Sequence, residues 1–148
     1  MQLVFIALIF LIDQLTKILA KTKLLYSNGV NIINGVFEFV YVENRGAAFG
    51  ILKNKKFFLV GVTTFVIGGM LYYLFTNKEL NKWYRASLIL IVAGAIGNLY
   101  DRVFRGYVID FIHVYYKTFF DFPVFNIADI SVVIGTFLLA LTMLFTKE

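Results

Sequence analysis

One stretch of twenty residues, FFLVGVTTFVIGGMLYYLFT at positions 57–76, contains no charged side chain. A helix rises about 1.5 Å per residue, so this length spans the roughly 30 Å hydrocarbon core of a bilayer. Lipid offers no hydrogen-bond partner to an open backbone, which leaves the helix as the stable form of such a segment. Positions 57–76 are therefore predicted to form a transmembrane helix.

Three further stretches are nearly as apolar, and each predicts another membrane helix. They cover about residues 1–20, 86–104 and 125–145. Hydrophobic residues make up 60% of the 148 residues, more than a soluble domain of this size can bury. The first stretch lacks the basic start and the small-residue cleavage site of a secretory signal peptide, so we expect it to be retained. These features predict a single membrane-embedded domain, residues 1–148, of the all-α class with four transmembrane helices.

Residues 21–56 differ in character from the apolar stretches on either side. The residues that indicate turns are Asn28, Gly29, Asn31, Asn34 and Gly35. The segment VFEFVYVEN is rich in Val, Phe and Tyr, which favours one or two short strands. NRGAAFG follows at 44–50, where Asn44 offers a donor and an acceptor and the small residues permit close approach. We predict a small β-element outside the membrane at about 30–50, between the first two helices.

Three aspartates lie in or beside strongly apolar sequence: Asp101, Asp110 and Asp129. A carboxylate at the edge of a bilayer is costly, so each one suggests a functional role. Asp110 and Asp129, brought together at the ends of two membrane helices, could share one proton. One would act as base on a water and the other as acid. The alternative is that each aspartate caps a helix or pairs with an arginine. The two aspartates together, with Asn126 three residues before Asp129, favour a catalytic role.

Composition removes several other kinds of chemistry. The chain has no cysteine, which excludes disulfides, thiol nucleophiles and thiolate metal sites. Its one histidine, His113, cannot form a metal cluster alone, so we predict no metal and no cofactor. A Ser–His couple would need His113 and one of three serines, which leaves carboxylate chemistry as the main candidate. The net charge of +5 suits anionic lipid headgroups, and its scattered basic residues do not indicate nucleic-acid binding.

Polar residues near the aspartates form pairs that a helix would bring together. Asp13 and Lys17 are four residues apart, so they share a helix face and we expect an ion pair. Asn98 and Asp101 are three residues apart and also share a face. Arg102 and Arg105 follow directly and could neutralise the acids.

These motifs together resemble the lipoprotein signal peptidases of bacteria, also called signal peptidase II. The resemblance covers the whole chain and rests on DQLTK (13–17), NRGAAFG (44–50), GAIGNLYDRVFRGYVIDFI (94–112) and FPVFNIADI (122–130). It implies an aspartic endopeptidase that removes the signal peptide from diacylglyceryl-modified prolipoproteins. The cut falls just before the lipidated lipobox cysteine. It also implies sensitivity to the peptide antibiotic globomycin and a small β-cradle between the first two helices.

The resemblance assigns roles to individual positions of this chain. Asp110 and Asp129 match the two catalytic aspartates. The positions matched to substrate binding are Asn44, Gly46, Asn98, Arg102 and Asn126. The positions matched to structural support are Asp13, Lys17 and Asp101. We expect a monomer whose partners are prolipoproteins and membrane lipids.

The resemblance also implies a multi-pass protein of the bacterial inner membrane. Both termini would lie in the cytoplasm, and the active site would lie toward the extracytoplasmic face. Ten of the 14 basic residues would then lie outside, which runs against the positive-inside rule. We favour the family topology because the modified cysteine of the substrate sits at the outer leaflet.

Two other classes of membrane protein also use intramembrane aspartates. A proton-coupled carrier uses acids as relays, but its acids usually lie near the midplane of several helices, often in repeated halves. No repeat is evident here. The presenilin-type peptidases carry a YD motif, which Tyr100 and Asp101 resemble, but their GxGD partner is replaced by GYVID at 106–110.

The acyl chains of such a substrate can remain in the bilayer, because lipid is as apolar as any protein groove. We expect the small residues Gly46, Gly94, Ala95 and Gly97 to leave a side opening between helices for the lipidated cysteine. The segment 30–50 would cover the peptide. Unlipidated precursor should then be cut far more slowly.

Overall fold

The computed structural model describes residues 1–46, 52, 55–116 and 119–145. Its four long helices are α1 (Gln2–Leu24), α2 (Lys56–Thr76), α3 (Lys82–Phe104) and α4 (Ile127–Phe145). All four are long and apolar enough to cross a membrane, which agrees with the predicted spans. α1 ends four residues later than predicted, at Leu24. α3 begins four residues earlier than predicted, at Lys82, because the Asn81 side chain accepts a hydrogen bond from the Trp83 backbone N–H at 3.0 Å and caps the helix.

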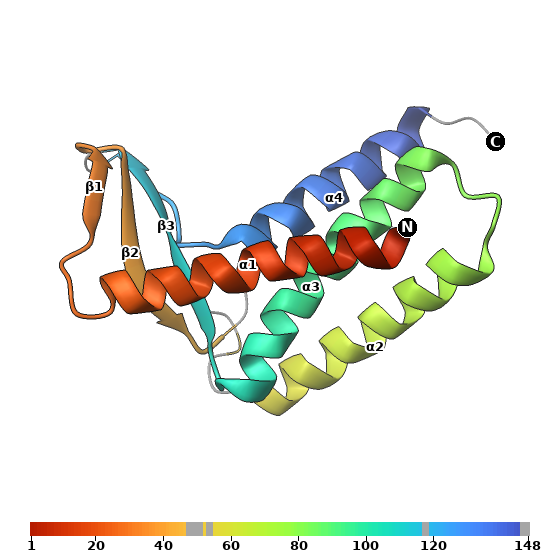
Figure 1. The fold of residues 1–148 in the computed structure, drawn as a ribbon. Helices are drawn as coiled ribbons and strands as arrows, with labels where there is room; N and C mark the ends of the chain where they lie inside the picture. The colour runs from red at the N-terminus through yellow and green to blue at the C-terminus, as the bar shows by residue number, and fades with distance from the viewer. Residues whose placement is uncertain (47–51, 53–54, 117–118, 146–148) are drawn as a thin grey trace.

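A four-stranded antiparallel sheet lies at one end of the helices (Figure 1). Its strands, in the order β1-β2-β3-β4, are β1 (Val30–Ile33), β2 (Phe37–Asn44), β3 (Val108–Tyr116) and β4 (Phe120–Asp121). Two of the strands therefore come from between α3 and α4, outside the predicted range 30–50, and the all-α label omits a real sheet. The β3 sequence VIDFIHVYY is rich in β-branched and aromatic residues, which suit a half-buried strand.

Strand pairing brings the predicted site residues toward one another. β2 and β3 pair so that Val42 lies opposite Asp110 and Asn44 lies opposite Val108. A register shift occurs between Phe39 and Val42. Beyond the shift, the end of β2 lies beside the start of β3, and both are close to the ends of the helices.

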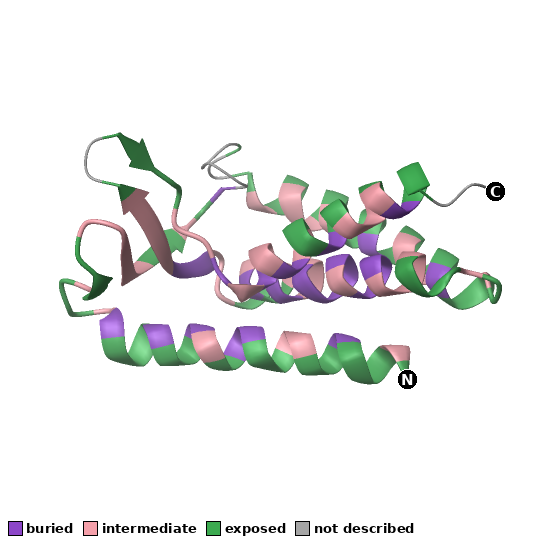
Figure 2. Ribbon diagram, turned by 90° about the horizontal axis from the view of Figure 1, so that it is seen from above, coloured by how far each residue is buried: buried purple, intermediate pink, exposed green. Residues whose placement is uncertain are grey.

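The helix α3 is the centre of the bundle. Half of its most apolar 18-residue window is buried, compared with 11% of the corresponding window of α2. Figure 2 shows buried residues along α3 and along the inner face of α1. A side chain at Gly94 would meet the Ala128 carbonyl oxygen at 2.3 Å, so α3 and α4 approach closely there. Around Gly68 and Gly69 in α2 a side chain would meet no described atom within 4 Å, so these glycines are not packing positions in this chain.

A cluster of apolar side chains joins the sheet to the helices. Its buried members are Ala20 and Leu24 from α1 and Ile109 and Phe111 from β3. Because alternate residues of a strand point to opposite faces, these β3 side chains leave Asp110 facing the other way. The N-terminal end of α1 and the C-terminal end of α4 both lie away from the sheet (Figure 1).

Candidate active site

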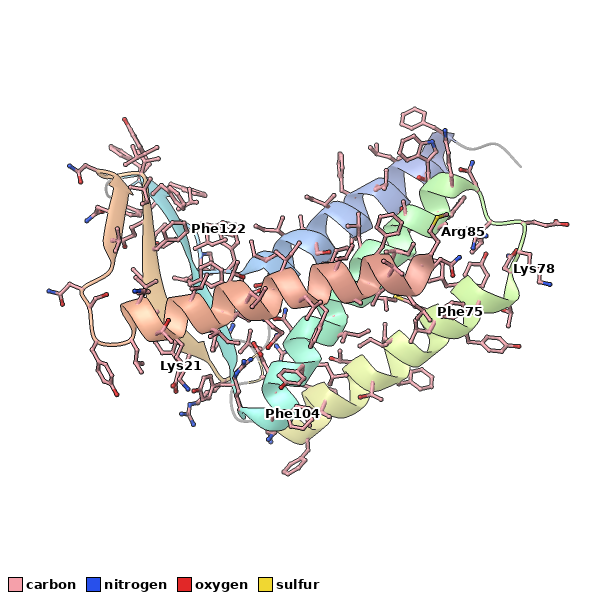
Figure 3. All side chains as sticks on the ribbon, in the orientation of Figure 1. Lys21, Phe75, Lys78, Arg85, Phe104 and Phe122 are labelled. Carbon is pink, nitrogen blue, oxygen red and sulfur yellow. The ribbon has the colours of Figure 1, made fainter. Side chains whose placement is uncertain are left out.

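A groove with a volume of about 1010 Å³ runs along the end of β2, the end of α3 and the first turns of α4. Its lining residues are Val42, Glu43, Asn44, Arg45, Gly46, Asn98, Arg102, Val108, Asp110, Phe122, Pro123, Val124, Phe125, Asp129, Ile130, Val132, Val133 and Ile134. Phe122, one of the lining residues, lies at the sheet end of the molecule in Figure 3, far from Lys78 and Arg85 at the other end of the bundle. Asp110 lies on β3 and Asp129 lies in the first turn of α4, so only one of the two aspartates is at a helix end as predicted.

Asn126 links the two aspartates directly. Its Nδ2 donates to Asp110 Oδ1 at 2.6 Å, and its backbone N–H donates to Asp129 Oδ2 at 3.1 Å. The Asp129 backbone N–H donates back to Asn126 Oδ1 at 2.9 Å. This reciprocal pattern is a capping box at the start of α4, so the local helix signal also sets the position of Asp129. Asn126 is fully buried, and its side chain has one defined place between the two carboxyl groups.

Each aspartate also accepts a hydrogen bond from one further asparagine. Asn44 Nδ2 donates to Asp110 Oδ2 at 3.0 Å, and Asn98 Nδ2 donates to Asp129 Oδ1 at 2.8 Å. Asn44 is held in turn by the Gly46 backbone N–H, which donates to its Oδ1 at 2.9 Å. Donors of this kind stabilise the ionised form of a carboxyl group.

Asp110 and Arg102 are two ionisable residues that line the groove. Burial, and then the charge of Asp129, raise the pKa of Asp110 to about 7, although hydrogen bonds from Asn44 and Asn126 oppose the shift. Arg102 lies beside the pair and donates from Nη2 to the Gly46 carbonyl oxygen at 3.0 Å. Its buried Nε has no hydrogen-bond partner among the described residues. The groove therefore holds a carboxyl that titrates near neutral pH and a guanidinium with a donor to spare.

A group of four charged residues, the buried cluster, lies beneath the groove. It consists of Asp13, Lys17, Asp101 and Arg105. Lys17 Nζ lies 2.8 Å from Asp13 Oδ2 and 2.9 Å from Asp101 Oδ2, and Arg105 pairs with Asp101. Two acids and two bases balance one another, as buried charges require. The predicted Asp13–Lys17 pair is confirmed.

The buried cluster also holds the backbone next to each aspartate of the groove. Asp13 Oδ1 accepts from the Ala128 N–H at 2.9 Å, and Ala128 directly precedes Asp129. Asp101 Oδ2 accepts from the Ile109 N–H at 3.3 Å, and Ile109 directly precedes Asp110. The cluster thus fixes the two chain segments that carry the groove aspartates.

Comparison with known proteins agrees with this arrangement. Residues 5–145 match the family described as signal peptidase (SPase) II. The chain belongs to the signal peptidase II family. It is 47% identical over 139 residues to a lipoprotein signal peptidase of Clostridium tetani, an alignment covering 94% of this chain and 89% of that protein. It is 43% identical over 144 residues to a lipoprotein signal peptidase of Clostridium novyi, covering 97% of each chain.

A solved structure has the same fold. It is described as a bacterial membrane enzyme studied by the in meso method, and it superposes with a TM-score of 0.87 at 30% sequence identity. The match covers 97% of this chain and 87% of the other. Family membership and the four apolar helices make this chain a multi-pass membrane peptidase of bacteria.

The residues that the sequence analysis assigned to the site lie in three places in the structure. Those that line the groove are Asn44, Gly46, Asn98, Arg102, Asp110 and Asp129. Asn126 lies buried between the aspartates, and Asp13, Lys17 and Asp101 lie in the buried cluster. The remainder of the NRGAAFG motif, residues 47–50, lies outside the described residues.

The predicted side opening is wrong in three of its four small residues. Gly94 packs against Ala128, and a side chain at Gly97 would meet Asp13 Oδ2 at 2.6 Å. Ala95 packs against a cluster of buried apolar residues from α1, α2 and α3. Only Gly46 lines the groove. Small residues on α3 serve close helix packing because the buried cluster needs α1, α3 and α4 to approach one another.

One contributor, Gln14, was not assigned from the sequence. Gln14 Nε2 donates to Asp13 Oδ2 at 3.0 Å and to Asp101 Oδ1 at 3.3 Å, and its Oε1 accepts from Arg105 at 2.8 Å. Nothing in the sequence connects Gln14 to residues more than eighty positions away. The prediction that Arg105 neutralises an acid is confirmed by its pairing with Asp101, four residues earlier on the helix.

Proposed function

We propose that this chain is an aspartic endopeptidase that removes the signal peptide from diacylglyceryl-modified prolipoproteins, cutting just before the lipidated cysteine. The observation that carries the proposal is the bridge formed by Asn126, whose side-chain and backbone N–H groups contact Asp110 and Asp129 respectively. Two carboxyl groups held this way in one groove suit acid–base hydrolysis of a peptide bond. The relatives named lipoprotein signal peptidases support the substrate class.

The two carboxyl groups take different parts in this mechanism. Asp110 holds the proton near neutral pH, since burial and then the neighbouring charge raise its pKa to about 7. Asp129 acts as the base and removes a proton from a water, whose oxygen attacks the scissile carbonyl carbon. Asp110 gives its proton to the carbonyl oxygen, which yields a tetrahedral intermediate. When the C–N bond breaks, Asp129 passes its proton to the leaving amine and Asp110 recovers a proton from the intermediate.

The other groove residues suit binding of an extended peptide. Asn44 and Asn98 present amide groups, and Arg102 presents a guanidinium to carbonyl oxygens of the substrate backbone. A carbonyl oxygen of the peptide would give the buried Arg102 Nε the hydrogen-bond partner that it lacks among the described residues.

Lipid recognition follows from where the groove opens. Val133 and Ile134 line it and are also exposed on α4, at 66% and 52%, so the groove reaches a helix face that would lie in lipid. Acyl chains can stay in the bilayer there at little transfer cost. The lipid anchor then sets the depth of the scissile bond. In this arrangement the aspartates lie toward the extracytoplasmic face and both termini in the cytoplasm, and the monomer is the working unit.

The test is cleavage of a lipidated precursor by the purified protein in detergent, followed on a gel. Asp110→Asn and Asp129→Asn should each lower turnover by roughly 10²–10⁴-fold while leaving the protein folded, because neither amide can transfer the proton. Asp121→Asn is the matched control, since Asp121 is 80% exposed on the sheet and outside the groove. Unlipidated precursor of the same sequence should be cut far more slowly.

Turnover above a few per cent in either groove variant would remove that aspartate from the mechanism. Equal rates on lipidated and unlipidated precursor would instead contradict only the lipid-anchored positioning.

A further inference from the structure

The end of β2 has a paired side and an open side. β3 pairs with β2 as far as Asn44, but β1 pairs with it only from Phe37 to Phe39 (Figure 1). No described strand therefore lies beside Val42 and Glu43 on the side away from β3. These two residues are exposed, whereas the part of β2 that precedes them is half-buried. An open strand edge presents N–H and C=O groups that a further chain can bind.

The backbone of Glu43 points to the open side. Glu43 lies opposite Ile109 in the pairing of β2 with β3. The Ile109 N–H donates to Asp101 Oδ2 at 3.3 Å, and its C=O accepts from Asn126 Nδ2 at 3.3 Å, so both groups face away from β2. Two residues opposite each other in this way form a non-hydrogen-bonded pair, in which the N–H and C=O groups of both point away from the partner strand. The N–H and C=O of Glu43 therefore face the open edge.

Glu43 lines the groove, and its backbone is the part of it that is available there. Its side chain lies on the same face of the sheet as Ile109, which packs against α1, and on the opposite face from Asp110. Arg45 Nη2 and Tyr41 OH donate to its carboxylate at 3.0 and 3.4 Å. The groups that Glu43 leaves without a partner among the described residues are thus its N–H and C=O.

The groove gives this open edge a place in the path of the precursor. Its lining extends from Ile134 on α4, where the helix face would lie in lipid, past Asp129 and Asp110 to Glu43 on β2. With the lipid anchor at the α4 end, the chain that follows the scissile bond leaves past β2. Neighbouring strands lie about 4.8 Å apart, so the open edge is about 10 Å from β3, a distance that about three residues of extended chain cover.

We propose that the open edge of β2 binds the precursor segment that follows the lipidated cysteine as an added strand, through the N–H and C=O of Glu43. This inference rests on the proposed function and adds to it a binding group for the segment beyond the scissile bond. Backbone hydrogen bonds of this kind give affinity without selecting a side chain. The edge therefore accepts precursors of different sequence at this position, proline excepted.

The test measures the Kd of a lipidated precursor for three proteins that all carry Asp129→Asn, which should hold the precursor without cutting it. One has no further change, one adds Glu43→Ala, and one adds Glu43→Pro. The alanine variant loses the side chain and keeps the N–H, whereas the proline variant loses both. Because an open edge has no ladder bond at this N–H, proline is compatible with the fold there. We expect the Kd of the proline variant to exceed that of the alanine variant by about three- to tenfold.

The matched control is Ile32→Pro in the same Asp129→Asn protein. Ile32 lies at the irregular position of β1 and outside the groove, so a proline there also alters the sheet. This control should leave the Kd in place.

A second measurement changes the precursor in place of the protein. Esters replace one peptide N–H at a time along the segment that follows the cysteine. We expect the Kd to rise at a position about three residues after the cysteine and to stay unchanged at the positions next to it, because a strand turns alternate N–H groups toward its neighbour.

Equal Kd values for the proline and alanine variants overturn the proposal, and so does an ester series without a sensitive position. If Glu43→Pro does not fold in detergent, the ester series decides the matter on protein that keeps Glu43. Failure of the proposed function is a separate result, since it appears as wild-type protein that binds the lipidated precursor and does not cut it. Absence of any binding overturns both.

Discussion

Two networks of charged side chains join separate elements of this protein, and they differ in their access to water. The buried cluster joins α1 and α3 and reaches the backbone of β3 and α4, and three of its four side chains are no more than 1% exposed. The second network, the sheet clamp, consists of Glu38, His113 and Asp121 on β2, β3 and β4. His113 Nδ1 lies 2.9 Å from Glu38 Oε1, and Nε2 lies 2.8 Å from Asp121 Oδ1.

The bond lengths of the two networks are alike, but their energetic consequences are not. The side chains of the sheet clamp are 19% exposed at Glu38 and His113 and 80% exposed at Asp121. Water can replace a lost partner on the sheet, whereas a charge left alone in the buried cluster has no substitute. The buried cluster therefore holds the groove in one geometry, and the sheet clamp can change with pH without loss of the fold.

The largest expected effect comes from removing one acid from each network. Asp101→Ala leaves Lys17 and Arg105 with one carboxylate between them, which should cost about 3–5 kcal/mol of unfolding free energy. Glu38→Ala should cost less than about 1 kcal/mol. Unfolding of both variants in the same detergent measures the difference. Equal losses would mean that burial does not separate the two networks.

A smaller effect should appear in the pH dependence of activity. Asp110 must carry a proton to act as the acid, and its pKa is raised to about 7, first by burial and then by the charge of Asp129. As pH rises past 7, kcat/KM should therefore fall, approaching about tenfold per pH unit. His113→Gln should leave this alkaline limb in place, because the sheet clamp is outside the groove. A limb that moved in His113→Gln would contradict the separation between the two networks. A flat profile from about pH 6 to 9 in the wild type would contradict the role of Asp110 as the acid.

How far the sequence predicts this structure depends on whether the partners of a residue lie near it or far from it along the chain. Local signals were sufficient where partners lie within a few residues: the Asp13–Lys17 pair follows from helical spacing, and the Asn126–Asp129 pair from a helix start. The four spans follow from apolar length alone. Asp110 and Asp129, which the sequence analysis selected, do line the same groove, and their catalytic roles stay a prediction.

Non-local pairing set the limits. The Asp110 strand was missed because VIDFIHVYY has no clean alternation, and its place depends on pairing with β2, more than sixty residues earlier. Gly94 and Gly97 were taken as lining an opening because a glycine in sequence does not reveal what lies against it. Their role depends on Ala128 and Asp13, which only the assembled helices bring near.

The smallest expected effect is at His113. Partial burial lowers the pKa of His113, but hydrogen bonds to Asp121 and Glu38 outweigh it, so the pKa lies above its ordinary value of 6.5. A raised histidine pKa means that the folded state binds the proton more tightly than the unfolded state. The stabilisation is therefore complete below pH 6.5 and is lost as pH rises through the higher folded value.

The difference in unfolding free energy between wild type and His113→Gln should therefore shrink as pH rises, by at most about 1 kcal/mol because the sheet clamp is partly exposed. Taking the difference removes the contribution of Asp110, which is common to both proteins. Asp121→Asn should reproduce part of the loss at low pH, since it removes one of the two acceptors from the imidazolium. A difference that stayed constant with pH would show that His113 is neutral in the clamp and that its two carboxylate contacts do not depend on a proton.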